Sequence, residues 1–247
     1  MKNKIKNEIS EYLCLLRSVP TVIFTLFVLS VFSMNLLANK SVSLPFRWMA
    51  IDCGTTLSWF AFLTMDVLTE RFGPKASTQI SLTATALNLF MCGIFYLGSI
   101  IPGLWGESFV DGSADIINTA LNNTFGGTWY VIVGSTIAFV ISSFINNFSN
   151  HAIGKCFKKN PDGIVAYFFR SFFSTTLSQF ADNFLFSTLV GRIFFGWSFY
   201  QIVGGALATS IAELILALLF TVPGHKICKF FDKHNVGNEY LELIKTK

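Results

Sequence analysis

The stretch TMDVLTERFGPK (residues 64–75) ends a hydrophobic segment and carries two carboxylates, Asp66 and Glu70, one helical turn apart. Successive residues of an α-helix are rotated by about 100°, so both side chains lie on one helix face. An ionisable side chain inside a membrane costs about 2.5 kcal/mol or more unless it is paired or hydrated. The two carboxylates therefore indicate a polar site inside a membrane protein, and transport is the first function that they suggest.

The composition does not fit a soluble domain. Hydrophobic residues make up 52% and charged residues 13% of the 247 residues, whereas soluble domains contain about 25% charged residues. The net charge of +4 comes from basic residues between apolar segments rather than from one basic face, so nucleic-acid binding is not expected. The five cysteines are scattered singly and the three histidines form no pair with metal spacing, so we expect no metal and no cofactor.

Six apolar segments are long enough to cross a bilayer, which needs about 20 residues each. They predict an all-α integral membrane protein, a six-transmembrane-helix bundle in which residues 1–247 form a single membrane domain. The spans are expected near 19–38, 49–70, 78–102, 128–148, 168–190 and 200–222. Lys and Arg concentrate on the side that holds both termini, which predicts cytoplasmic termini by the positive-inside rule. The connection 103–127 contains three acidic residues and neither Lys nor Arg, as expected of an outside loop.

Both ends of the chain are predicted to be short cytoplasmic segments. A polar stretch with Lys2, Lys4 and Lys6 precedes a first span that is too long for the apolar part of a signal peptide, so we expect no cleavable leader. The tail from Gly224 is interpreted as an amphipathic end held at the lipid headgroups.

Polar residues on the predicted spans fall into two layers. At 1.5 Å per residue, the middle layer lies roughly 12–21 Å below the outer boundary and contains Trp59, Asn88, Gln179, Asp182 and Glu213. The lower layer lies roughly 25–32 Å down, at the cytoplasmic end, and contains Asp66, Glu70, Asn146 and Arg170. The middle layer is the candidate ligand site. The lower layer is either an ion-paired floor, in which Arg170 or Arg71 pairs with the carboxylates, or ordinary interfacial charge with Arg170 directed outward.

Some polar and small residues also have a purely structural interpretation. Ser and Thr often join membrane helices at under about 2 kcal/mol each, and this alternative stays open for Ser135, Ser142, Ser171 and Thr175. The structural interpretation is weaker for the four carboxylates of the spans, because charged groups are a poor choice for joining helices in a membrane: Asp66, Glu70, Asp182 and Glu213. Small residues on the sixth span, Gly204, Gly205, Ala208 and Ala212, are interpreted as sites of close helix approach.

No motif for enzymatic chemistry is present. The glycines match neither dinucleotide-binding nor phosphate-binding spacing, so the chain is not expected to hydrolyse ATP by itself. No Ser/His dyad is apparent. Asp66 and Asp182 would be conceivable as an aspartate pair, but no catalytic flanking motif accompanies them. The protein is therefore not expected to be an enzyme.

The quoted stretch 64–75 resembles the inner end of the second span in the queuosine-precursor transporters of the vitamin uptake transporter group. RSFFSTTLSQFAD (170–182) resembles the fifth span of that family, and SFINN (143–147) fits its fourth. The resemblance covers about residues 20–222. It implies a multi-pass protein of the bacterial inner membrane that imports 7-deazaguanine bases, the precursors of queuosine in tRNA, or queuine.

Such a base fits the polar residues of the spans. Its N–H donors would face a carboxylate such as Asp182 or Glu70, and its carbonyl would accept a hydrogen bond from Gln179 or Asn146. Its ring would stack on an aromatic side chain, either Trp59 or Tyr96. The predicted substrate-binding residues are Trp59, Asp66, Glu70, Asn88, Tyr96, Asn146, Arg170, Gln179, Asp182 and Glu213.

Two modes of transport remain open. The first is a self-sufficient importer, coupled to an ion gradient or driven by trapping of the base; a coupled proton would be carried by Asp66, Glu70 or Asp182. The second is the substrate-capture subunit of an energy-coupling-factor complex for a vitamin or nucleobase. Those subunits typically carry a seam of small residues on the first span, whereas FTLFVLSVFS (24–33) is bulky. We therefore expect no ATPase partner, only a small nucleobase-like substrate and the lipid bilayer, and the oligomeric state stays open.

Overall fold

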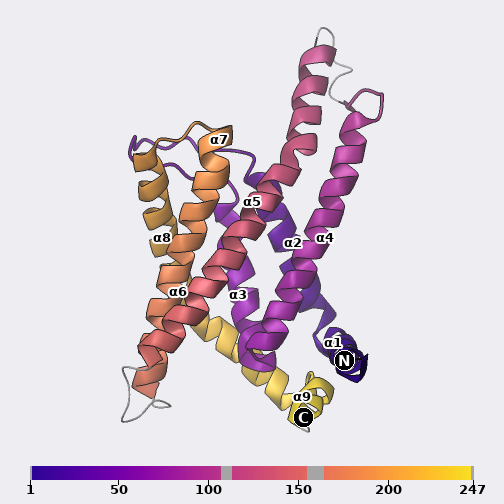
Figure 1. The fold of residues 1–247 in the computed structure, drawn as a ribbon, viewed down its shortest axis with the longest axis vertical. Helices are drawn as coiled ribbons and strands as arrows, with labels where there is room; N and C mark the ends of the chain where they lie inside the picture. The colour runs from indigo at the N-terminus through magenta and orange to yellow at the C-terminus, as the bar shows by residue number, and fades with distance from the viewer. Residues whose placement is uncertain (1, 107–112, 155–163, 246–247) are drawn as a thin grey trace. The chain divides into compact units, whose positions relative to one another are not determined.

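The computed structural model describes residues 2–106, 113–154 and 164–245. Its elements are α1 (Lys2–Ser18), α2 (Thr21–Leu37), α3 (Thr55–Phe72), α4 (Pro74–Ile100), α5 (Ala114–Gly154), α6 (Ile164–Phe186), the π-helical turn η2 (Ser187–Gly191), α7 (Arg192–Phe194), α8 (Phe199–Lys233) and α9 (Asn238–Lys245) (Figure 1). Those ranges contain no strand, only an isolated bridge between Ser41 and Asp52. The predicted all-α class is confirmed.

The helices group into two compact units. Unit 1 comprises Met1–Met34, Thr56–Asn88 and Leu216–Lys247, and unit 2 comprises Asn35–Thr55 and Leu89–Ile215. Helices α4 and α8 each contribute one part to unit 1 and the other part to unit 2. The units are described one after the other below.

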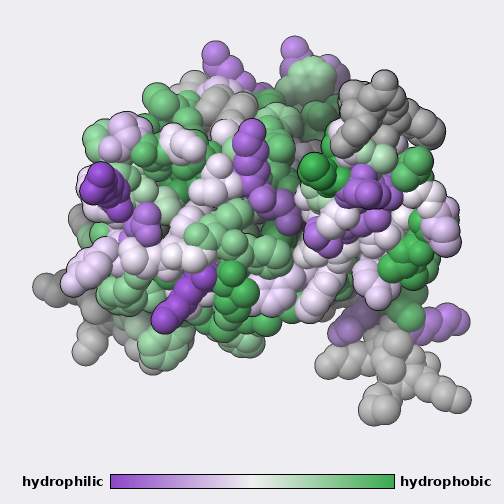
Figure 2. All heavy atoms as spheres, turned by 90° about the horizontal axis from the view of Figure 1, so that it is seen from above, coloured by the Kyte–Doolittle hydropathy of each residue, from purple (hydrophilic) through white to green (hydrophobic). Residues whose placement is uncertain are grey.

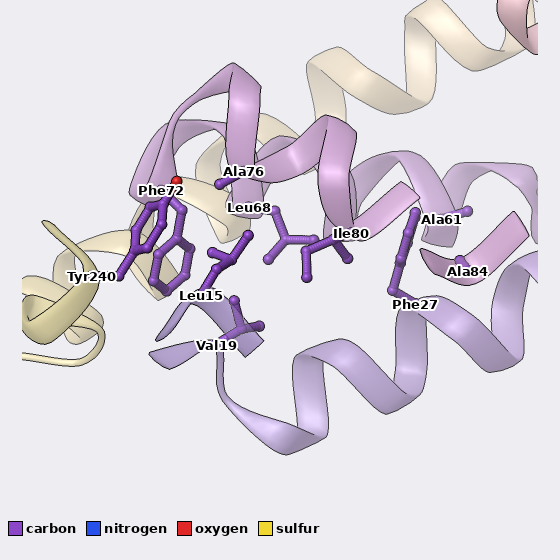
Figure 3. Close-up of a cluster of buried hydrophobic side chains, with 10 residues drawn as sticks. All are labelled: Leu15, Val19, Phe27, Ala61, Leu68, Phe72, Ala76, Ile80, Ala84 and Tyr240. Atoms are coloured by element: carbon purple, nitrogen blue, oxygen red, sulfur yellow. The ribbon is translucent and has the colours of Figure 1, made fainter. Parts of the chain in front are cut away.

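Unit 1 is built around the turn between α3 and α4. Gly73 has a φ of +87°, a conformation that glycine adopts without steric cost, so α4 can begin directly after this residue. Buried apolar side chains extend from this turn along the α3–α4 pair: Leu15, Val19, Phe27, Ala61, Leu68, Phe72, Ala76, Ile80, Ala84 and Tyr240 (Figure 3). Because Leu15 comes from α1 and Tyr240 from α9, both ends of the chain pack on the α3–α4 pair.

Polar contacts fix the same arrangement. The Arg71 guanidinium donates from Nε and Nη2 to the carbonyl oxygen of Val236, over 3.0 and 2.6 Å, and from Nη2 to Asn238 Oδ1 over 3.0 Å. It also forms an ion pair with Asp232. Arg71 therefore ties α3 to the α8–α9 connection, a structural role that the sequence did not reveal. On the other side of the turn, Lys75 forms an ion pair with Glu11 of α1.

The N-terminal helix α1 was not predicted. It covers the polar stretch before the first span, and the helix pair Lys6–Ser18 and Thr21–Leu37 is bent by 99°. The bend falls at Pro20, which has no backbone N–H and disfavours a helical conformation at Val19. Helix α1 is held by packing on unit 1 and by the hydrogen bond between the Tyr12 and Thr83 hydroxyl groups, 2.5 Å apart.

Unit 2 contains the longest helix, α5, which has 41 residues and a length of about 60 Å. It begins at Ala114, although the sequence suggested an irregular connection up to about residue 127. Contacts with other segments stabilise the helical conformation of residues 114–127. The Trp105 indole stacks on Phe125 with ring centroids 5.0 Å apart and donates from Nε1 to Asn122 Oδ1 over 2.8 Å. The extra turns therefore extend the helix beyond the predicted span.

Residues 40–53 form a short hairpin in unit 2. The Val42 N–H donates to the Ile51 carbonyl over 2.9 Å, and the Cys53 N–H donates to the Lys40 carbonyl over 2.8 Å. The second span was predicted to begin near residue 49, but residues 49–53 belong to this hairpin and α3 begins at Thr55. The difference arises because the hairpin pairs its own backbone groups before the helix starts.

The hairpin lies directly on α8. A Cβ atom at Gly205 would lie 2.0 Å from the Ala50 carbonyl oxygen, and one at Gly204 would lie 2.3 Å from the Trp48 carbonyl oxygen. The absence of side chains at both positions thus lets the hairpin backbone contact the helix. The prediction that these two glycines serve close helix approach is wrong, because their neighbour is a hairpin.

Three helical stretches in the described ranges are long and apolar enough to cross a membrane: Pro74–Ile100, Ala114–Ser142 and Phe199–Leu216. The bent pair α1–α2 would be a fourth if it is counted as one span. Large apolar side chains such as Val22, Phe90 and Phe148 are more than half exposed, and Figure 2 shows apolar residues over much of the surface in view. Such a surface is suited to lipid rather than water.

The predicted number of six spans is not confirmed. Helix α3 carries Asp66, Glu70 and Arg71, and α6 carries Arg170, Gln179 and Asp182. These polar groups lower the mean hydropathy of the two helices below that of an ordinary lipid-facing span. Helices α3 and α6 can lie within a membrane only if these polar groups are buried against other protein segments.

Candidate functional site

The ten predicted site residues are divided between the two units. Unit 1 contains Trp59, Asp66, Glu70 and Asn88, and unit 2 contains Tyr96, Asn146, Arg170, Gln179, Asp182 and Glu213. The backbones of all ten are helical. The side chains of Trp59, Asp66, Glu70, Asn146 and Arg170 lie outside the described residues.

The two predicted residues on α4 differ in exposure. Asn88 is 2% exposed, and its Oδ1 atom has no hydrogen-bond partner among the described residues. Tyr96 lies two turns further along and is half-exposed. A buried amide oxygen without a donor is costly, so Asn88 has the character of a group that is completed by a ligand or by water.

The clearest polar cluster in unit 2 lies on α6. Asp182 Oδ1 is 3.0 Å from Ser142 Oγ of α5, and the same Ser142 Oγ is 3.0 Å from the Phe139 carbonyl oxygen. A hydroxyl group has one hydrogen to donate, so these two acceptors share it. The Asp182 carboxylate thus receives at most part of one neutral hydrogen bond from Ser142.

Gln179 lies one helical turn before Asp182. Its side chain is 6% exposed, and its Oε1 atom has no hydrogen-bond donor among the described residues. Residues three apart on a helix are neighbours on its surface, so Gln179 and Asp182 present hydrogen-bond acceptors side by side. The pair can bind a group that brings two or more N–H donors.

A second set of contacts joins α6 to α8. Asn183 Nδ2 lies 2.9 Å from Glu213 Oε2, 3.2 Å from Ser210 Oγ and 3.0 Å from the Gln179 carbonyl oxygen. Glu213 is buried, with 5% of its surface exposed. The amide of Asn183 therefore fixes the Glu213 carboxylate next to the helix that carries Gln179 and Asp182.

Of the predicted residues, Gln179 and Asp182 thus lie one turn apart on α6, and Glu213 of α8 contacts α6 through Asn183. Asn183 and Ser210 were missed as site residues. The signal for Asn183 was its spacing, since it follows Gln179 by one helical turn and shares a helix stripe with it. Its pairing with α8 depends on tertiary contact, which no spacing within one helix reveals.

An apolar groove of about 650 Å³ adjoins this cluster. Its lining comes from α5, α6 and α8: Phe148, Ser149, Ala152, Ile153, Phe173, Thr176, Leu177, Phe180, Leu207, Ser210, Ile211 and Leu214. Ser210 belongs both to the groove and to the contacts of Asn183. An apolar surface with a few buried polar groups at one edge is the usual make-up of a small-molecule site.

No group of His, Cys, Asp and Glu in the described part of the chain has the arrangement of a metal site. The polar groups around α6 and α8 are carboxylates, amides and hydroxyls. Their chemistry is that of binding by hydrogen bonds and charge.

Comparison with known proteins places these residues in a transporter family. A family model described as "Putative vitamin uptake transporter" matches residues 52–224, a range that contains all ten predicted site residues. A curated relative, "Probable queuosine precursor transporter" of Bacillus subtilis (strain 168), is 28% identical over 155 residues. That match covers 63% of this chain and 62% of the relative, so the two proteins correspond over less than two thirds of their lengths. No solved structure matches. Because the family model covers more than half of an all-helical chain with apolar spans, the chain belongs to the vitamin uptake transporter family and is a multi-pass membrane protein.

Proposed function

We propose that the protein imports queuosine precursors, 7-deazaguanine bases or queuine, across the bacterial inner membrane. The observation that carries the proposal is the excess of buried hydrogen-bond acceptors on α6. Gln179 Oε1 has no donor among the described residues, and Asp182 shares one hydroxyl hydrogen with a backbone carbonyl. The 2-amino-4-oxopyrimidine edge of a deazaguanine carries a ring N–H donor next to an amino N–H donor. These donors would form hydrogen bonds with the acceptors on α6.

The other predicted residues complete the proposed site. The side chains of Trp59, Asp66, Glu70, Asn146 and Arg170 are assigned to it on the sequence alone. Within unit 2, Tyr96 would stack on the base. The roles of Trp59 and Asn88, which belong to unit 1, are proposed from the sequence alone. Phe180 lines the groove next to Gln179 and offers the ring an aromatic neighbour from the same helix.

We further propose that the chain works as one membrane domain of six spans with both termini in the cytoplasm. In this arrangement the polar groups of α3 and those of α6 would each be buried against protein rather than face lipid. The bulky sequence of residues 24–33 in α2 supports an importer without an ATPase partner. Co-purification of ATPase subunits with the intact protein would instead support the substrate-capture subunit of an energy-coupling-factor complex.

Thermal unfolding of the detergent-purified protein tests the substrate class. The ligands are queuine, 7-aminomethyl-7-deazaguanine, 7-cyano-7-deazaguanine, guanine and several vitamins. A ligand at one hundred times its dissociation constant stabilises the native state by about 2.7 kcal/mol, which is measurable as a rise in Tm. We expect a rise with at least one deazaguanine and none with guanine. A rise with a vitamin alone would refute the proposal and favour vitamin capture.

A matched pair of variants tests the place of the site. Asp182→Asn keeps the shape of the side chain but removes its charge, so we expect at least tenfold weaker binding of the base with little change in the Tm of the ligand-free protein. Asp115→Asn, at the exposed first turn of α5, is the control and should bind as the wild type does. Full affinity in a folded Asp182→Asn protein would remove Asp182 from the site.

A further inference from the structure

One face of helix α1 is exposed and combines apolar with basic side chains. Successive residues are rotated by about 100°, so four side chains lie within about 80° around the helix axis and form the outer stripe of α1: Lys6, Ile9, Leu13 and Arg17. All four are exposed, Ile9 to 54% and Leu13 to 47%. On the opposite face, Leu15 and Glu11 are 0% and 4% exposed. The outer stripe is therefore the side of α1 that does not pack on unit 1.

The acidic residues of α1 lie on the packed side. Glu11 forms an ion pair with Lys75 at the start of α4, and Glu8 also contributes to the electrostatic environment of Lys75. Figure 3 shows Leu15 of α1 among the side chains of α3 and α4. By contrast, Lys6 and Arg17 form no ion pair with any described residue. The outer stripe thus presents positive charge next to apolar surface.

The direction of α1 fits a position in the plane of the membrane. Helix α2 has 17 residues without Asp, Glu, Lys or Arg and is about 25 Å long, close to the thickness of a hydrocarbon core. In the proposed arrangement α2 is the first span. The segment Lys6–Ser18 is bent by 99° from α2, so it runs along the membrane surface instead of continuing through the bilayer.

We infer that α1 is an interfacial helix whose outer stripe binds anionic phospholipids of the cytoplasmic leaflet. Ile9 and Leu13 insert at the boundary between headgroups and acyl chains, and Lys6 and Arg17 extend their charges to the lipid phosphates. The negative surface potential of this leaflet attracts both cations. The inference rests on the proposed arrangement of the spans and is independent of the substrate.

Hydrogen exchange of the full-length protein in lipid nanodiscs tests the inference. One set of nanodiscs contains phosphatidylcholine alone, and the other contains phosphatidylcholine mixed with phosphatidylglycerol. Opening of α1 would withdraw both cations from the lipid phosphates, so we expect the amides of residues 6–18 to exchange at least fivefold more slowly in the anionic nanodiscs. High salt should reduce this difference, because it screens exposed charges. Equal exchange in both sets would overturn the inference and favour a protein partner for the outer stripe.

A matched pair of double variants tests the charges. Lys6→Gln combined with Arg17→Gln should abolish the difference between the two sets of nanodiscs. Lys40→Gln combined with Arg192→Gln removes two exposed cations outside α1 and should retain the difference. If the first double variant also retained it, Lys6 and Arg17 would be excluded as the lipid-binding residues.

Replacement of the apolar pair tests insertion. Ile9→Ser combined with Leu13→Ser should speed the exchange of residues 6–18 at least threefold in both sets of nanodiscs, because the hydroxyl side chains gain nothing from the acyl boundary. Unchanged exchange would show that the outer stripe faces water, against the inference. Binding of deazaguanines in detergent involves no charged lipid, so either result leaves the proposed function to its own test.

Discussion

Ser142 of α5 and Asp182 of α6 lie 3.0 Å apart, oxygen to oxygen, and the hydroxyl that joins them is also 3.0 Å from the Phe139 carbonyl oxygen. Ser142 is buried, with 6% of its surface exposed, and its hydroxyl group lies between two acceptors. The contact links two neighbouring helices and orients the carboxylate that we place at the centre of the substrate site.

Replacement of Ser142 by Ala tests this contact. Loss of the hydroxyl leaves the Asp182 carboxylate without its donor from α5, so we expect three- to tenfold weaker base binding in equilibrium titrations. Hydrogen bonds between membrane helices contribute about 1–2 kcal/mol or less, so the ligand-free Tm should fall only slightly. Ser142→Thr retains the hydroxyl and should restore binding. Ser135→Ala, on the same helix and only partly buried, is the control; equal effects of the two Ala variants would contradict the assigned role.

Substitution of Gly205 by Ala tests the contact between the hairpin and α8. Alanine normally stabilises a helix interior by about 1 kcal/mol relative to glycine, but here the added Cβ would lie 2.0 Å from the Ala50 carbonyl oxygen. We therefore expect a lower Tm and faster hydrogen exchange of the hairpin amides in residues 40–53. Gly98→Ala is the matched helical control, since a Cβ there meets nothing within 4 Å. A Tm of Gly205→Ala at or above that of Gly98→Ala would show that the hairpin does not rest on α8.

The hairpin also gives stability a dependence on pH. Burial raises the pKa of Asp52 from its usual 3.8 to about 6, and the hydrogen bond from the Gly54 N–H to Asp52 Oδ1, 2.7 Å long, opposes this rise. The folded protein thus holds this proton more tightly than the unfolded chain does. The contribution of protonated Asp52 to the free energy of unfolding is fully present below pH 4 and is lost as the pH rises through 6. The loss amounts to at most about 3 kcal/mol.

The variant Asp52→Asn isolates this effect. It keeps an oxygen that accepts from the Gly54 N–H but cannot ionise, so the difference in Tm between pH 5 and pH 8 should be smaller than in the wild type. Asp115→Asn, at an exposed position, should leave the difference unchanged. A pH profile of Asp52→Asn that matches the wild type would show that other groups dominate the titration.

The Arg71 contacts predict that lysine cannot replace this arginine. The guanidinium binds Val236, Asn238 and Asp232 at once, which an ammonium group cannot reproduce because it lacks the planar array of donors. With hydrogen bonds to charged groups contributing about 1.5–3 kcal/mol, Arg71→Lys should increase proteolysis within residues 232–245 several-fold. The exposed Arg192 provides the control as Arg192→Lys. Equal cleavage of the two variants would disprove the role of Arg71 in holding the C-terminal segment.

The sequence predicted the helical class and the family because both depend on local patterns. Apolar runs identify spans whatever their neighbours are, and the motif residues 64–75 and 170–182 are contiguous. Spacing along one helix also predicted that Gln179 and Asp182 lie one turn apart on the same face of that helix. The contact between Asn183 and Glu213 could not be predicted in this way, because the two residues lie on different helices.

Other differences between the predicted and the observed structure also arise from contacts between distant segments. Helix α1 was overlooked because its polar residues mask a buried side that includes Leu15. The early start of α5 depends on Trp105, which binds the first turns of that helix through Asn118 and Asn122. Arg71 was considered only as a partner for carboxylates of its own span, whereas the partners described for it, Asp232, Val236 and Asn238, lie far along the chain. In each case a contact between distant segments decides the conformation or the partner, rather than the pattern of neighbouring residues.

The packing of both chain ends on the α3–α4 turn has a consequence for biosynthesis. Helix α9 contacts α1, and Tyr240, 1% exposed, packs near Phe72 with ring centroids 6.3 Å apart. Residues 238–245 are synthesised long after α1 and the α3–α4 turn. The surface around Phe72 and Leu15 therefore lacks its final cover until α9 has left the ribosome. Nascent chains that stop before residue 238 should thus lack a complete unit 1.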